Sequence, residues 1–201
     1  MTKQYSPIIY HYNKNISDKA INEFKQILDI GCGCRKFPNA IGIDKIENGN
    51  VNIKWDLNDY PWPLKDNFFD LIIAQHSLEH LNDVVKTMEE IYRIGKNGAR
   101  VLIQVPFFRN LDAISDITHK HLFSTKSMDY FLENTKVFNY HYSMARFEQV
   151  GMWLGWPSES KNLLRGFLKS FINKFPNFYE KYLSIIYPVK NIAWELIIKK
   201  I

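Results

Sequence analysis

Hydrophobic residues along the chain fall into short, nearly continuous runs that are separated by polar turns. Such runs cover residues 26–30, 40–43, 71–74 and 99–105. Continuous apolar runs of this length are typical of parallel strands that are buried on both faces. Residues 51–55 alternate apolar and polar positions instead, which favours a strand nearer the edge of the same sheet.

The segment between the fourth and fifth of these strands has the periodicity of a helix. Either Asn82 or Asp83 can cap its start, and Gly95 and Gly98 end it. Apolar residues recur at steps of three and four, which places them on one face. They are Val84, Val85, Met88, Ile91 and Tyr92. Strands that alternate with helices predict an α/β fold with a doubly wound, mostly parallel sheet.

The second half of the chain supplies the remaining elements. A helix capped by Ser124 is expected to bury an apolar face, formed by Met128, Phe131 and Leu132. Residues 143–152 and 192–201 are predicted to be the last two strands, which makes seven. The length of 201 residues fits a single domain over 1–201. Within it we expect an N-terminal arm or helix at 1–25 and a helical insertion or lid at 155–190.

A glycine turn follows the first predicted strand. Gly31 and Gly33 let the backbone turn sharply and approach a ligand where a Cβ would clash. Asp44 ends the second strand, where a carboxylate can accept both hydroxyls of a ribose. A dinucleotide site of the NAD type would need a third glycine, and residues 34–36 contain none.

Residues 28–33, with the sequence LDIGCG, resemble the first motif of class I S-adenosylmethionine (SAM)-dependent methyltransferases. Asp44 matches the ribose-binding acid of that superfamily. An acid after the third strand contacts the adenine amine in these enzymes; Asp56 is the candidate, with the neighbouring Asp59, or a purely local turn bond by Asp56, as alternatives. Residues 76–81, HSLEHL, match the small-molecule "type 11" branch. The resemblance covers roughly residues 26–135. It implies a Rossmann-like methyltransferase fold with an antiparallel last strand.

The resemblance also implies a cofactor, SAM, and a set of residues that bind it. They are Asp29, Gly31, Cys32, Gly33, Asp44, Lys45, Asp56, Leu57, Gln75 and His76. The implied reaction moves a methyl group to an oxygen or nitrogen of a small-molecule, glycan or lipid-type acceptor. Two alternatives stay open: a metal-assisted O-methyltransferase, including RNA 2′-O enzymes, and a non-catalytic interaction module with the same fold.

Two loops near the predicted cofactor site have distinctive sequences. Residues 34–39 separate the first two strands and include Pro38, so we expect a loop or a single turn in place of the first crossover helix. Residues 60–64 form a stiff aromatic loop with two prolines. Trp62 in this loop can cover the adenine face or pack on the surface.

Histidines follow the carboxyl ends of the fourth and fifth predicted strands. His76 and His80 follow the fourth, and His119 lies in the long loop after the fifth. These ends are neighbours in a doubly wound sheet, so we expect His76, His80 and His119 as catalytic residues that remove a proton from the acceptor. His119 is favoured as the base because its loop is free to close over substrate. A structural role for these histidines stays open.

The same residues offer metal ligands as an alternative. His76, Glu79, His80 and His119 resemble the Glu-x-x-Glu-His arrangement of metal-assisted O-methyltransferases, with His76 in place of the first glutamate. That replacement shifts the preference from magnesium toward zinc, iron or nickel. The inverzincin pattern H-x-x-E-H also fits, but it requires a helical protease scaffold, whereas this string follows a parallel strand.

The predicted insertion is amphipathic. Its apolar face consists of Leu163, Leu164, Phe167, Leu168, Phe171, Ile172 and Phe175. Its other side carries Lys161, Arg165, Lys169 and Lys174. Such a segment can pack on the sheet, act as a substrate lid, or make a peripheral membrane contact through 161–187.

Composition and short motifs limit the classes of partner and the cellular location that we expect. The chain has 26 Lys and Arg against 21 Asp and Glu, a net charge of +5 that permits an anionic partner without requiring one. Residues 74–77 lack the Asp/Asn-Pro-Pro motif of base methyltransferases, which argues against nucleic acid. Cys32 and Cys34 are too close for a good disulfide. With no signal peptide or bilayer-spanning run, we expect a cytoplasmic protein that is either free or membrane-peripheral.

Overall fold

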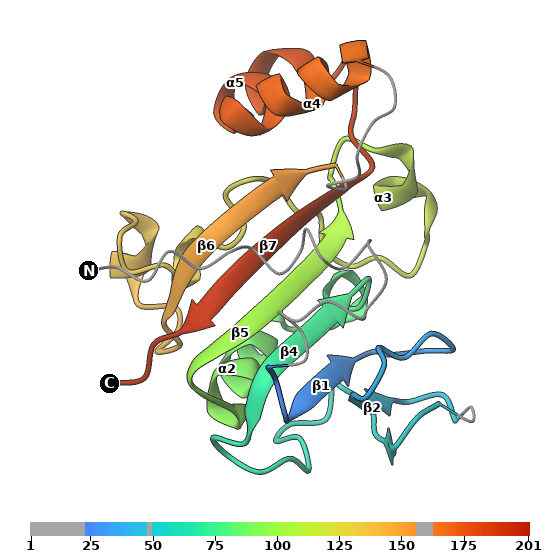
Figure 1. The fold of residues 1–201 in the computed structure, drawn as a ribbon, viewed down its shortest axis with the longest axis vertical. Helices are drawn as coiled ribbons and strands as arrows, with labels where there is room; N and C mark the ends of the chain where they lie inside the picture. Colours follow the sequence, from blue (N-terminus) through green and yellow to red (C-terminus); the bar gives the residue numbers. More distant parts are fainter. Residues whose placement is uncertain (1–22, 48–49, 156–162) are drawn as a thin grey trace.

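The computed structural model describes residues 23–47, 50–155 and 163–201. These residues form a seven-stranded sheet with the order β3-β2-β1-β4-β5-β7-β6 (Figure 1). The strands are β1 (Ile27–Ile30), β2 (Ile41–Asp44), β3 (Ile53–Lys54), β4 (Phe69–Gln75), β5 (Gly95–Pro106), β6 (Phe147–Leu154) and β7 (Asn191–Ile198). Neighbours from β3 to β5 pair in parallel, and β7 runs antiparallel to both β5 and β6. The predicted doubly wound sheet with one antiparallel strand is confirmed.

Strand register places the functional loops at one end of the sheet. Ile30 is level with Ala74 in β4, and Gln75 is level with Gln104 in β5. The glycine turn after β1 and the histidine segment after β4 therefore leave the sheet side by side. Asn191 at the start of β7 is level with Pro106 at the end of β5, so the antiparallel strand begins at the same end.

Helix α2 (Val84–Ile94) covers one face of the sheet (Figure 1). Of the two predicted caps, Asp83 is the one used: its carboxylate accepts a hydrogen bond from the amide of Lys86 at 2.9 Å. The inward positions of the helix are fully buried against β4 and β5. They are Met88, Ile91 and Ile94 from the helix and Ile72, Val101 and Ile103 from the strands. This burial explains the three- and four-residue spacing in the sequence.

The chain passes from β1 to β2 without a helix, as predicted from the short spacer. Residues 31–40 form turns, and Phe37 is buried on the opposite face of the sheet from α2. The amide of Phe37 donates to the carboxylate of Asp29 at 2.7 Å, which fixes the loop against β1. The predicted N-terminal arm lies almost entirely outside the described residues.

The helix predicted after Ser124 does not form. Only a 3-10 turn, Asp129–Phe131, is present, although Met128, Phe131 and Leu132 are buried as expected. Local hydrogen bonds from side-chain hydroxyls take the place of helical ones. Ser127 Oγ accepts from the amide of Ser124, and Thr135 Oγ1 donates to the carbonyl of Leu132. Ser and Thr compete with helix formation in this way.

The helical insertion is present between β6 and β7. It contains α4 (Leu163–Lys174), the short α5 (Pro176–Phe178) and a π-helical turn, Tyr179–Leu183. Figure 1 shows α4 and α5 beyond the end of the sheet rather than against its face. Short helix α3 (Leu111–Ser115) lies in the loop after β5. No helix within the described ranges has both the length and the apolar character needed to cross a bilayer.

Candidate active site

The turn after β1 has the backbone conformation that its glycines predict. Gly31 has φ +66° and Gly33 has φ +48°, both in the left-handed region. The amide of Gly31 donates to the carbonyl of Ile43 at 2.9 Å, which joins the turn to β2. A Cβ on Gly31 would lie 2.6 Å from Cβ of Ser77, so no larger residue fits without displacement. The turn thus brings bare backbone against the segment that follows β4.

Asp44 fixes two backbone segments around the end of β2. One carboxylate oxygen accepts from the amide of Gly33 at 2.9 Å, and the other accepts from the amide of Ile46 at 2.9 Å. A carboxylate has about four lone-pair sites, so each oxygen can accept a further hydrogen bond. Asp44 therefore organises the glycine turn and can still bind a diol.

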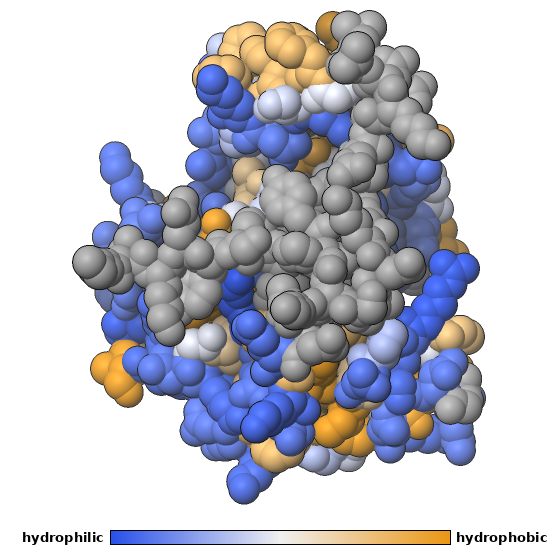
Figure 2. Space-filling view, in the orientation of Figure 1, coloured by the Kyte–Doolittle hydropathy of each residue, from blue (hydrophilic) through white to orange (hydrophobic). Residues whose placement is uncertain are grey.

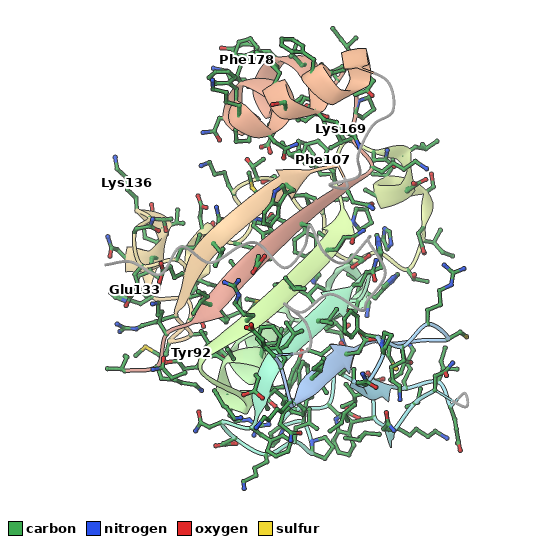
Figure 3. The ribbon with its side chains drawn as sticks, viewed as in Figure 1. Tyr92, Phe107, Glu133, Lys136, Lys169 and Phe178 are labelled. Carbon is green, nitrogen blue, oxygen red and sulfur yellow. The ribbon has the colours of Figure 1, made fainter. Side chains whose placement is uncertain are left out.

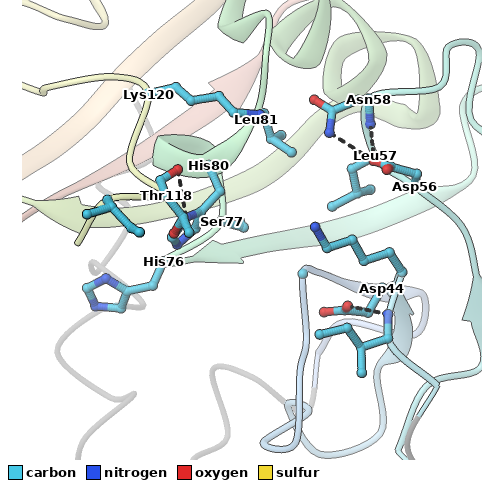
Figure 4. A pocket seen from close by; sticks show the side chains of 14 residues that line it. Asp44, Asp56, Leu57, Asn58, His76, Ser77, His80, Leu81, Thr118 and Lys120 are labelled. Atoms are coloured by element: carbon cyan, nitrogen blue, oxygen red, sulfur yellow. Dashed lines mark hydrogen bonds between the residues drawn. The ribbon is translucent and has the colours of Figure 1, made fainter.

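A cavity of about 520 Å³ opens over the glycine turn and the ends of β2 and β4 (Figure 4). Six of the residues predicted to bind the cofactor line it: Gly31, Asp44, Lys45, Asp56, Leu57 and His76. We call it the cofactor cavity. Its volume lies in the range of about 300–1,000 Å³ that is usual for small-molecule sites.

Four other predicted cofactor residues do not line this cavity. They are Asp29, Cys32, Gly33 and Gln75. Asp29 is buried beneath the turn, and burial raises the pKa of its carboxyl to about 6. Burial also raises the pKa of the Cys32 thiol to about 11, so this thiol is protonated and unreactive at neutral pH. These two side chains and the Gly33 amide shape the turn from below in this structure.

The loop after β3 presents Asp56 to the cofactor cavity. Its Oδ1 accepts from both the amide and the side-chain nitrogen of Asn58 at 2.9 Å, and these hydrogen bonds lower the pKa of the carboxyl. Trp62 neither covers the cavity nor packs on the surface. It is buried in the core, where its amide donates to Glu90 and its indole donates to the carbonyl of Leu57. A buried indole N–H usually has a hydrogen-bond acceptor, and here the acceptor is the carbonyl of Leu57.

Sequence reasoning missed Ser77 as a functional residue. Its side chain is 5% exposed and lines the cofactor cavity, and its hydroxyl has no hydrogen-bond partner within the described part of the chain. A buried hydroxyl without a partner is uncommon, and this one faces the cavity, where it can bond a group that is bound there. Thr118 and Lys120 line the cavity as well, from the loop after β5. No pattern in the sequence points to these three residues individually.

A second cavity, also about 520 Å³, lies beside the first. It is lined by His76, Glu79, His80, Pro106, Asp112, Ser115, Asp116, His119 and Asn191. We call it the acceptor cavity. His76 and His80 line both cavities and therefore stand between them. All three predicted catalytic histidines are thus brought together, as the register of β4 and β5 required.

His76 is held from both sides of its ring. Its Nδ1 lies 3.2 Å from Oε1 of Glu79, and its Nε2 lies 3.2 Å from the side-chain nitrogen of Gln104. An ionised carboxylate only accepts hydrogen bonds, so Nδ1 carries the proton and Nε2 accepts from the amide. His76 also has φ +53°, which is unusual for a residue other than glycine. Such conformations concentrate at functional sites.

His80 and His119 differ from His76 because each keeps one ring nitrogen that can accept a proton. His119 Nδ1 lies 2.9 Å from the carbonyl of Ala113, and His80 Nδ1 lies 3.0 Å from Oγ1 of Thr118, whose hydroxyl donates to Asp116. Both Nδ1 atoms are therefore donors, which leaves the lone pair on each Nε2. The rings lie 4.8 Å apart between centroids. His119 Nε2 is also 3.7 Å from a carboxylate oxygen of Asp116.

Glu79, His80 and His119 each offer one ligand atom, and these atoms lie within 4.8 Å of one another. The side chain of Glu79 is 1% exposed, and its Oε2 has no hydrogen-bond partner among the described residues. One carboxylate and two imidazoles fit zinc, nickel or iron by their chemistry. The arrangement can thus act through its imidazole lone pairs or hold a cation.

Known proteins share this architecture. Residues 36–103 match a family model described as "Methyltransferase domain". A SAM-dependent methyltransferase structure from Archaeoglobus fulgidus is 19% identical with a TM-score of 0.56, covering 86% of each chain. The structure of the [4+2]-cyclase SpnF has a TM-score of 0.52 at 15% identity, covering 88% of this chain and 74% of that one. Likeness at this level shows the fold, and one fold can host several reactions.

One curated relative is the norajmaline N-methyltransferase of Rauvolfia serpentina. It is 29% identical over 120 residues, which are 48% of this chain and 41% of that protein. The chain thus spans about two fifths of the relative's length. The residues that match the family model run from the loop after the glycine turn into β5, and they include Asp44, Asp56 and His76 of the cofactor cavity. Over residues 36–103 the chain therefore resembles the methyltransferase domain family, and its fold is the one found in SAM-dependent methyltransferases.

Proposed function

We propose that this protein transfers a methyl group from SAM to a nitrogen or oxygen of a small-molecule acceptor. The observation that carries the proposal is the pair of adjoining cavities with His76 and His80 lining both. One cavity has the glycine turn and Asp44 for the nucleoside part of SAM. The other offers imidazole lone pairs to an acceptor that carries a proton.

SAM supplies an electrophilic methyl group on a sulfonium. In the in-line displacement, the acceptor lone pair forms the bond to carbon, and the breaking bond leaves its electron pair on sulfur. The acceptor also loses a proton, which we assign to Nε2 of His119, the base favoured by its loop position. Alignment of the two reactants accounts for a large part of such a rate enhancement. His76 is fixed by Glu79 and Gln104 and is suited to positioning.

We favour an amine acceptor over an alcohol, because the relative from Rauvolfia serpentina is an N-methyltransferase. The acceptor cavity has a volume suited to a small molecule, and the carboxylates of Asp112 and Asp116 line it. Carboxylates at the rim attract a protonated amine, which must be deprotonated before it can attack.

The test is a methyl-transfer assay with radiolabelled SAM over a panel of amines, phenols and alcohols. We expect product from at least one class, dependent on His119. An inactive protein that still binds SAM would instead indicate a non-catalytic interaction module. A His119→Gln variant that keeps full turnover would remove His119 from the reaction while leaving methyl transfer itself intact.

A second candidate is a metal-assisted methyl transfer, favoured by the convergence of Glu79, His80 and His119. These residues would hold the ion, and the Nδ1 hydrogen bonds to Ala113 and Thr118 would orient the rings as in other histidine sites. A bound ion would polarise the acceptor oxygen. Calorimetric titration of chelator-treated protein with Zn²⁺ tests this: a stoichiometric site that Glu79→Gln removes supports it, and no binding excludes it.

A further inference from the structure

The helical insertion, residues 163–190, has an outer surface that no described residue covers. Its large apolar side chains remain exposed to solvent. They are Phe167 (73% exposed), Phe175 (45%), Phe178 (48%), Tyr182 (54%), Ile185 (68%), Ile186 (83%) and Tyr187 (49%). Figure 2 shows hydrophobic residues gathered at this end of the molecule, over α4 and α5. A patch of this kind on a folded protein marks an interaction site.

The insertion is firmly attached by its inner side. Asn173 exchanges hydrogen bonds with both the amide and the carbonyl of Leu154 at the end of β6, at 2.8 and 3.1 Å. Tyr179 is fully buried, and its hydroxyl donates to the carbonyl of Tyr187 and accepts from the amide of Val189. Figure 3 shows Phe178 on the side of the insertion away from the sheet. The exposed side chains are thus presented by an ordered scaffold.

The insertion is predominantly basic. Residues 163–190 contain five basic residues and one acidic residue, whereas the whole chain carries only +5. The single acid, Glu180, is engaged with the amide of Thr125 at 2.8 Å. The ammonium groups of Lys174 and Lys181 lie 5.5 and 5.1 Å from the ring centres of Phe175 and Tyr182. Cations therefore border the apolar patch.

We propose that this surface docks on an anionic lipid bilayer. Phe, Tyr and Ile side chains beside lysines match the layered polarity of the membrane interface, where apolar groups enter the acyl boundary and lysines meet phosphates. A second copy of this chain would place like charges opposite each other, which is unfavourable. Lysine is depleted at protein–protein interfaces, so a protein partner fits this surface less well.

Docking here would bring the acceptor cavity close to the lipid surface. The insertion leaves the sheet after Leu154 and returns at Asn191, which lines the acceptor cavity together with Pro106. The ring of Phe107, the next residue after β5, lies 6.1 Å from that of Tyr179 in the insertion. Lipid binding by this surface does not depend on methyl transfer and is tested without it.

The experiment is co-sedimentation of the full chain with vesicles of phosphatidylcholine alone or mixed with phosphatidylserine. We expect binding to the mixed vesicles that weakens as salt is raised, because exposed charges are screened. The triple variant Phe167→Ser/Phe178→Ser/Ile186→Ser should lose about tenfold or more in affinity, because three exposed apolar groups no longer enter the interface. The variant Lys174→Glu/Lys181→Glu should lose the preference for phosphatidylserine.

The matched control is Tyr140→Ser/Met144→Ser, because both residues are 66% exposed and precede β6, at the other end of the sheet. Control binding should equal that of the native chain, and all variants should keep the native melting temperature because only exposed side chains change. Absence of vesicle binding overturns the proposal, as does equal loss in the control. Light scattering that shows a dimer broken by the triple variant would also overturn it, in favour of a second copy.

Discussion

The Nδ1 atom of His76 lies 3.2 Å from Oε1 of Glu79, and the carboxylate is 1% exposed while the imidazole is 40% exposed. The buried partner therefore holds an accessible ring at the boundary of the two cavities. The backbone carbonyl of Glu79 also accepts from the amides of Lys120 and His121, which attaches the loop after β5. One residue thus positions both histidine segments.

Replacement of Glu79 tests whether this residue positions the ring of His76. Glu79→Ala should lower kcat/KM by about 10–100-fold, because the ring of His76 loses the acceptor that orients it. Glu79→Gln keeps an acceptor for His76 and should recover most of the turnover if the role is positioning. Steady-state kinetics of both variants give the answer. Equal kinetic defects in the two would contradict a positioning role.

The three histidines should differ in what their loss changes. His119→Ala should lower kcat by about 10²–10⁴-fold, the usual effect of losing a general base, with little change in SAM affinity. His80 and His76 also line the cofactor cavity. We therefore expect His80→Ala and His76→Ala to lower both kcat and SAM affinity. His141→Ala, outside both cavities, is the control. Unchanged turnover in all three stable variants would remove the cluster from the active site.

Gly31 should be the most constrained glycine of the turn. Gly31→Ala places a Cβ 2.6 Å from Ser77 and forces a left-handed conformation that alone costs about 1–2 kcal/mol. Gly98→Ala separates the two effects, because Gly98 has φ +83° and nothing within 4 Å of its added Cβ. Thermal denaturation should therefore show a larger loss for Gly31→Ala than for Gly98→Ala. Equal losses would mean that Ser77 moves aside freely.

Asp29 should make folding stability depend on pH. Burial raises the pKa of its carboxyl from 3.8 to about 6, so the folded state binds more protons than the unfolded state between those values. Its contribution is fully present below about pH 4 and is lost as the pH rises through 6. The difference in unfolding free energy between native protein and Asp29→Asn should thus fall by about 2 kcal/mol from pH 4 to 7. A difference that rises with pH would contradict this assignment.

The apolar runs predicted the centre of the sheet, because β1, β4 and β5 are mostly buried apolar strands. Turn residues marked several strand ends: Gly31 follows β1, Asp44 ends β2 and Pro106 ends β5. The absence of a first crossover helix was predicted because only six residues, 34–39, separate the glycine turn from β2, and Pro38 is one of them.

By contrast, the prediction of a helix after Ser124 was wrong. Side-chain hydroxyls form hydrogen bonds with the local backbone there, and the spacing of apolar residues does not show that these bonds compete with helical ones. Trp62 was misplaced because its burial depends on the distant acceptor Glu90.

For the site, register explains why the histidines converge, since Gln75 and Gln104 are paired neighbours at the ends of β4 and β5. The hydroxyl of Ser77, which has no hydrogen-bond partner among the residues that the structure describes, could not be predicted, because a sequence does not show whether a serine is buried. The outer surface of the insertion is a similar case: the sequence showed an amphipathic helix, and only the packing shows which apolar residues remain exposed.

The central claim is that the cofactor cavity binds SAM through Asp44. The most direct measurement is calorimetric titration with S-adenosylhomocysteine, the demethylated product, of the native chain, Asp44→Ala and Glu47→Ala. Glu47 is a matched acid that is 76% exposed and pairs with Lys54. The account predicts one site, weakened by about 1–3 kcal/mol in Asp44→Ala because ribose hydroxyls lose their acceptor, and unchanged in Glu47→Ala. No heat of binding to the native chain at millimolar ligand, or equal affinity in all three proteins, would contradict it.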